Sequence, residues 1–141
     1  MPIESEPSVL PGILLSDLSI IEQGTQKRSL VGCFDQFAFP QFPATYLRFF
    51  LTFWVSNIEG TVRELDLTTR IEQTGSAHVV FSSSIKLPLG EERRFARTEI
   101  MAFSVPVPGI TFPTPGTYRV LILLNGDEVG KRDINVLQVA T

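Results

Sequence analysis

A stretch near the C-terminus, from Pro113 to Val136, constrains the fold more than any other part of this chain. It contains a Pro115-Gly116 turn, a run of β-forming residues from Thr117 to Leu124, and then Asn125-Gly126-Asp127. A β-branched run that ends in Asn-Gly is among the strongest short-range hairpin signals, because these residues tolerate the positive φ angles of a tight turn. The stretch predicts a β-hairpin in an all-β domain and indicates no particular chemistry.

The rest of the chain repeats this pattern of extended runs and turn signals, with no sustained helical period. Pro106-Val107-Pro108-Gly109 is expected to end one of the strands, and Glu91–Arg94, the one stretch of helix-like composition, is too short to be stable alone. In the terminal hairpin we expect a central first strand and a β-bulge around Gly130. The predicted fold is all-β: an antiparallel β-sandwich, immunoglobulin-like or jelly-roll-like, with about eight strands.

The 141 residues are enough for one domain with one core. We expect residues 12–141 to form a single β-sandwich domain. Residues 1–11 hold three prolines, which block helix and remove ladder donors, so an extended or mobile N-terminal arm is predicted there.

Charge and cysteine usage bear on partners and location. The net charge of −3 favours neither nucleic acid nor an anionic membrane. No apolar run approaches the ~20 residues that span a bilayer, and the N-terminal residues lack the pattern of a signal peptide. The single cysteine, Cys33, cannot build an internal disulfide framework. A cytoplasmic protein without membrane or nucleic-acid partners is expected.

Most of the aromatic residues fall between Phe34 and Trp54. A long strand from Thr45 to Ser56 would place Leu47, Phe49, Leu51, Phe53 and Val55 on one face, and both of its faces are largely apolar. The other face supplies the candidate interaction residues, which are Tyr46, Arg48, Phe50 and Trp54. Two outcomes stay open: this face is exposed for association, or the N-terminal arm or the Phe37–Phe42 loop covers it.

Two stretches, Leu15–Asp35 and Pro108–Val120 with the hairpin after it, resemble an uncharacterised bacterial family catalogued as a domain of unknown function. The resemblance implies a compact β-sandwich and supplies no activity, cofactor or catalytic residue. Tyr118, which follows Pro-Gly-Thr, is also similar to the corner tyrosine of immunoglobulin-like sandwiches, whose hydroxyl bonds back to nearby backbone.

Catalytic and metal-binding patterns are weak throughout. His78 is the only histidine, and we expect it on the surface; Cys33 is expected to be a buried, inert thiol. Asn125, Asp127 and Glu128 are better explained by a hairpin turn than by calcium, and Asp17 is expected to face outward rather than be a buried acid. We predict no catalytic, cofactor-binding or metal-binding residues, no cofactor, and no enzyme.

These observations favour a non-catalytic β-sandwich that serves as an interaction or structural module. Its partner is left open, with a homo-oligomer or another protein as the alternatives. The alternative function is binding of a small ligand or carbohydrate, with the exposed aromatic rings stacking on it.

Overall fold

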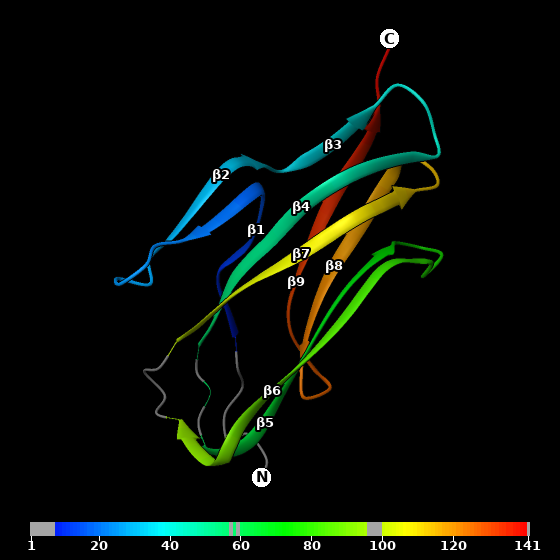
Figure 1. Cartoon of the computed structure of the whole chain (residues 1–141). Helices are drawn as coiled ribbons and strands as arrows, with labels where there is room; N and C mark the ends of the chain where they lie inside the picture. The colour runs from blue at the N-terminus through cyan, green and yellow to red at the C-terminus, as the bar shows by residue number, and fades with distance from the viewer. Residues whose placement is uncertain (1–7, 57, 59, 96–99, 141) are drawn as a thin grey trace.

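The computed structural model describes residues 8–56, 58, 60–95 and 100–140, and these form a β-sandwich (Figure 1). Its nine strands are β1 (Ser8–Ile21), β2 (Arg28–Phe34), β3 (Gln36–Phe39), β4 (Ala44–Ser56), β5 (Gly60–Gln73), β6 (Val79–Phe95), β7 (Met101–Phe112), β8 (Gly116–Leu124) and β9 (Asp127–Gln138).

The strands form two sheets, one in the order β2-β1-β4-β7 and the other in the order β3-β9-β8-β5-β6. All pairs are antiparallel except β3 with β9, which run parallel. The predicted all-β sandwich is confirmed. The order β9-β8-β5-β6 beside a β4–β7 pair corresponds to strands G-F-C-C′ and B-E of immunoglobulin-like domains and favours that type over a jelly roll.

The terminal hairpin forms as predicted, with β8 central in its sheet. Asn125 and Gly126 have φ angles of 50° and 88°, as a tight hairpin turn of the primed type requires. The register of β8 with β9 shifts between Ile122 and Leu123, opposite Gly130, which is the predicted bulge. Tyr118 is fully buried, and its hydroxyl donates a 2.6 Å hydrogen bond to the carbonyl of Thr114, which confirms the tyrosine corner.

The core lies between the sheets and takes alternate residues from the long strands, as period-two burial requires. Its fully buried members include Phe49, Leu51, Phe53 and Val55 of β4, Leu65, Leu67 and Ile71 of β5, and Val120, Ile122 and Leu124 of β8. Along β5 the buried residues Leu65, Leu67 and Ile71 therefore alternate with less buried polar residues, as in a strand with one face to the core.

Several segments differ from the sequence-based prediction. A ninth strand, β3, occupies the predicted loop, because it finds a parallel partner in β9. The stretch Glu91–Arg94 belongs to β6, since its residues pair with the start of β5. Pro106 and Pro108 do not end β7; they fit because β7 is an edge strand, where missing N–H donors cost no ladder bonds.

The first strand begins inside the predicted arm. β1 starts at Ser8 and pairs with β4 from there, so residues 8–11 are extended as part of a sheet. Residues 1–7 of that arm lie outside the described residues.

Candidate functional site

The four residues predicted as one interaction face do not lie on one face of β4, because the in-and-out alternation of side chains shifts by one residue within this strand. Tyr46 packs against Phe34, Phe37 and Phe49, with ring centroids 5.6, 5.1 and 5.8 Å away, so it turns toward the core. Leu47, expected inside, is 84% exposed. Alternation thus breaks between Tyr46 and Phe49, and the prediction for Leu47 is wrong.

The cause lies in the neighbouring strand. In β7, Val107 and Ile110 are both buried although they stand three residues apart, so β7 changes phase beside β4. Gly109, between them, has a φ of 64°, a conformation that glycine accepts without strain. The two strands switch faces together, which leaves Tyr46 on the inner side.

The other three residues lie on the outer face of the four-stranded sheet. The Arg48 guanidinium lies 4.9 Å from the centroid of the Phe50 ring, a cation–π contact. Arg48 is exposed, whereas Phe50 and Trp54 are half-buried. Thr52, between them, is fully buried, so something covers this face.

The cover is the β1–β2 hairpin. The Ser104 hydroxyl of β7 lies 2.9 Å from that of Ser19 and 3.0 Å from that of Thr52, and it accepts a 3.0 Å hydrogen bond from Arg28. Arg28 also donates to the carbonyl of Ala102. Because β4 lies between β1 and β7, these bonds require the hairpin to fold across the outer side of β4. The Phe37–Phe42 loop does not make these bonds, although Phe37 does contact Tyr46, and residues 1–7 of the arm lie outside the described residues.

The hairpin bends where Asp17 faces Gly32. Register is kept on both sides of this point, from Ser16 opposite Cys33 to Leu18 opposite Val31. Gly32 has a φ of 68°, and a Cβ there would lie 2.7 Å from Asp17 Oδ2. Glycine is therefore required both by the backbone conformation and by the close carboxylate.

Asp17 is exposed, as predicted, and one of its carboxylate oxygens accepts a hydrogen bond from the Tyr46 hydroxyl. Burial raises the pKa of Tyr46 to about 12, with further contributions from this hydrogen bond and from the negative charge of Asp17. The phenol is therefore a neutral donor at neutral pH.

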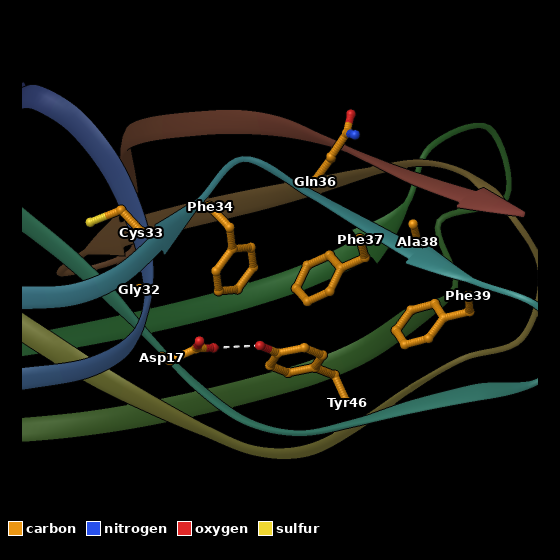
Figure 2. A pocket seen from close by; sticks show the side chains of 9 residues that line it. All are labelled: Asp17, Gly32, Cys33, Phe34, Gln36, Phe37, Ala38, Phe39 and Tyr46. Carbon is orange, nitrogen blue, oxygen red and sulfur yellow. Dashed lines mark hydrogen bonds between the residues drawn. The ribbon is translucent and has the colours of Figure 1, made fainter. Parts of the chain in front are cut away.

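These two residues border a pocket of about 310 Å³ at the point where the chain passes from β2 to β3 (Figure 2). Figure 2 shows the rings of Phe34, Phe37 and Phe39 in a row, with Tyr46 and Asp17 across from them. The lining is completed by Gly32, Cys33, Gln36 and Ala38. An apolar wall with a few polar groups is typical of small-ligand sites.

A second pocket of similar volume lies on the other side of Cys33 and Phe34. It is lined by Leu14, Leu15 and Asp35 as well, and by Arg132, whose guanidinium donates to the carbonyl of Ile13. The lining of this pocket therefore includes both a cation and a carboxylate, whereas the lining of the Asp17 pocket includes a carboxylate and no cation.

The far side of the hairpin is apolar and exposed. Leu18 lies opposite Val31, and Ile20 follows on the same side, since Ser19 and Arg28 point the other way toward β7. Leu18 and Ile20 are each 45% exposed and Val31 is 50% exposed. We call Leu18, Ile20 and Val31 the hairpin outer face.

The remaining candidate residues stand apart. His78 is exposed just before β6. Cys33 is exposed on β2, so the prediction of a buried thiol is wrong; its neighbour Phe34 packs against the core, and strand alternation turns Cys33 to the other side. Among the residues that the structure describes, no three His, Cys, Asp or Glu side chains gather as a metal site.

Sequence reasoning missed the Asp17–Tyr46 pair and the role of the hairpin as a cover. The available signals were an acid within an apolar strand and a glycine in the returning strand. Neither signal identifies Tyr46 as the hydrogen-bond partner of Asp17, because the two residues lie 29 positions apart in the sequence.

The fold and the site define a β-sandwich domain of immunoglobulin-like strand order with an aromatic pocket beside a folded-over hairpin. The chain belongs to a family of unknown function, DUF6941, whose model matches residues 12–137. The resemblance to a domain of unknown function, drawn from two stretches of sequence, is confirmed. Comparison with curated proteins gave no match. Over the described ranges, no helix has the length and apolar character needed to cross a membrane.

Proposed function

We propose that this domain is a non-catalytic interaction module that associates with a second copy of itself through the hairpin outer face. The observation that carries the proposal is the exposure of Leu18, Ile20 and Val31, three large aliphatic side chains placed side by side. Grouped apolar side chains on a surface are costly in water and usually mark an association site.

The hairpin is held in place before any partner arrives. Hydrogen bonds of Ser19 and Arg28 fix the hairpin to the Ser104 hydroxyl. The same hydroxyl also forms a hydrogen bond with the buried hydroxyl of Thr52. A surface that is already ordered loses less conformational entropy on binding than a mobile one. This supports association through a rigid platform.

The adjoining sheet edge also favours association. Natural edge strands carry charges, prolines or short lengths that prevent pairing with other chains. β7 has Pro106 and Pro108, β6 has Lys86 and Pro88, and β3 has four residues. β2 contains no proline, lysine or acid, and its one charged residue, Arg28, is turned toward β7.

A second copy is the partner that best suits this chemistry. Under two-fold symmetry the same patch meets itself, and a patch without charges has no self-repulsion to overcome. Interfaces between identical chains are also more apolar than those between transient partners.

Sedimentation velocity over a range of protein concentrations tests the proposal. The wild type should form a dimer, and Val31→Lys should weaken it at least about tenfold, because a charge would be buried against its own copy. Leu47→Lys is the control, since Leu47 is also a large aliphatic residue and is more exposed than Val31, but lies outside the hairpin. A wild type that stays monomeric, or a Leu47→Lys variant that dissociates equally, would overturn it.

Absence of catalysis, a cytoplasmic location and a bacterial source belong to the same proposal. His78, the single histidine of the sequence, is exposed in the β5–β6 connection and lines neither of the two pockets described above, which supports a non-catalytic role. The single cysteine supports a reducing compartment. The resemblance of Leu15–Asp35 to a bacterial family supports a bacterial source for this protein.

The second candidate function, binding of a small ligand, is favoured by the pocket beside Asp17. A carbohydrate platform made of Tyr46, Phe50 and Trp54 together is not favoured, because Tyr46 faces inward while the other two face outward. The pocket therefore takes the place of the predicted aromatic face as the candidate ligand site.

A further inference from the structure

We propose that the pocket between Asp17 and the Phe34–Phe39 segment binds an organic cation, an amine or methylated ammonium group. The carboxylate would face the positive charge, and the aromatic rings would pack on the methyl or methylene groups around it. This inference rests on the second candidate function, ligand binding at this pocket, and it names the class of ligand.

The charge of the pocket is the first argument. Asp17 is the only charged residue that lines it, and in the described part of the chain no Lys, Arg or His side chain forms an ion pair with this carboxylate. The neighbouring pocket is the contrast, because Arg132 lines it as well as Asp35. An exposed carboxylate without a cation, in a pocket that is also lined by aromatic rings, suits a cationic ligand.

The aromatic rings are the second argument. Ring faces carry negative electrostatic potential, so an ammonium group gains cation–π attraction there, and several rings together make a cage for methylated amines. Phe37 is buried and packs against both neighbours, with its ring centroid 5.1 Å from that of Phe34 and 6.2 Å from that of Phe39, so it supports these two rings rather than facing the ligand itself. The Phe34 and Phe39 rings are half-buried, which leaves part of each open to a ligand.

The carboxylate is also held in position. Oδ1 accepts the bond from Tyr46, while Oδ2 lies over Gly32, where the missing side chain leaves it room. Tyr46 and Phe37 pack edge to face at 5.1 Å, which fixes the phenol in turn. Preorganised groups of this kind lose little entropy when a ligand binds.

The size of the pocket limits the ligand to a small group. A volume of about 310 Å³ lies at the lower end of small-molecule sites, enough for a trimethylammonium group with a short tail. The same group is presented by a free amine such as choline and by a methylated lysine side chain of a protein, so both serve as probes.

Titration of ¹⁵N-labelled protein with choline, followed by NMR, tests the inference. The neutral control is 3,3-dimethylbutan-1-ol, the carbon isostere of choline, and ionic strength is held constant with sodium chloride. We expect choline to shift the amide signals of Asp17, Gly32 and Phe34 in a saturable way. The isostere should bind at least about fivefold more weakly, because it lacks the charge.

Two variants test whether the Asp17 carboxylate is the group that attracts the cationic ligand. Asp17→Asn keeps an acceptor for the Tyr46 hydroxyl but loses the charge, and it should weaken choline binding at least about fivefold. Asp133→Asn is the matched control, because it removes an exposed carboxylate that does not line the pocket, and it should retain binding. A peptide with trimethyl-lysine that binds more tightly than choline would assign the site to a protein tail, and the reverse order would assign it to a free amine.

Each contrary result has a distinct meaning. Equal binding of choline and its isostere, or unchanged binding to Asp17→Asn, would overturn the cation claim while ligand binding at the pocket stands. No saturable shift with either probe would overturn the cation claim together with the ligand function. None of these results bears on association through the hairpin outer face.

Discussion

The phenol of Tyr46 on β4 donates a hydrogen bond to the carboxylate of Asp17 on β1, across the site where the β1–β2 hairpin leaves the sheet. Because this bond joins the bend of the hairpin to the aromatic cluster, it connects the candidate pocket with the proposed association surface.

The ionisation of Tyr46 reports directly on this bond. Its pKa of about 12 is raised first by burial, which remains in Asp17→Asn, so the pKa should fall only part of the way toward 10 there, because the charged acceptor and its repulsion of the phenolate are lost. The pKa is raised in the folded state, so the stabilisation is fully present below pH 10 and is lost as pH rises toward 12. The chain has two tyrosines, so NMR with ¹³Cζ-labelled tyrosine resolves each titration. An unchanged Tyr46 pKa in Asp17→Asn would show that the bond does not form in solution.

Gly32 should be sensitive to substitution for two reasons that can be separated. Gly32→Ala should lose about 1–2 kcal/mol of stability from its positive φ alone, and the new Cβ should push Asp17 away from Tyr46. Gly75→Ala is the matched control, because Gly75 also has a positive φ, of 88°, but a Cβ there would meet no atom within 4 Å. Urea unfolding should show a loss in both variants, while only Gly32→Ala should lower the Tyr46 pKa. A Tyr46 pKa that moves equally in both would contradict the close approach.

Ser104 should hold the hairpin against the sheet. Ser104→Ala leaves the buried Thr52 hydroxyl without this partner and removes the bonds to Ser19 and Arg28, at a cost of about 1–3 kcal/mol. Amide hydrogen exchange in β2 should accelerate more than exchange in β8. Thr111→Ala serves as the control, because it removes an exposed hydroxyl pair with Thr45 on the same two strands. Equal effects of the two substitutions would argue against a hairpin fixed by Ser104.

The terminal hairpin shows which parts of this fold a sequence can predict. Asn125-Gly126 and the Pro115-Gly116 turn are local signals, and both the hairpin and the Tyr118 corner form where they indicate. The alternation of Leu65, Leu67 and Ile71 likewise depends only on neighbouring residues, since a sheet with one wet face imposes it.

The candidate site depends instead on contacts between distant segments. β3 was missed because its only ladder partner is the last strand, β9. The inward turn of Tyr46 follows from a phase change that β4 shares with Gly109 of β7, which the β4 sequence does not contain. The cover over Thr52 comes from Ser19 and Arg28, whose polar side chains carry no sign of their shared partner.

Three substitutions on β4 should separate the core from the outer face. Phe53→Ala should cost about 3–5 kcal/mol, because this ring is fully buried between the sheets. Trp54→Ala should cost clearly less, since Trp54 is half-buried on the outer side, and Leu47→Ala should be nearly neutral. Urea unfolding at equilibrium measures all three. If Trp54→Ala were as unstable as Phe53→Ala, Trp54 would belong to a second core under the hairpin, which would contradict this division.

Association through the hairpin outer face would bring the β1–β2 hairpins of two copies together, and a distance measured between the copies tests this. Cys33 is the only cysteine, is exposed, and lies two residues from Val31, so a spin label on it reports on the hairpin outer face. Double electron–electron resonance should give a defined distance between the labels of two copies. It should be shorter than that from labels on Ala77→Cys in a Cys33→Ser background, at the β5–β6 turn. No intermolecular distance from Cys33, or a shorter one from Ala77→Cys, would contradict the account.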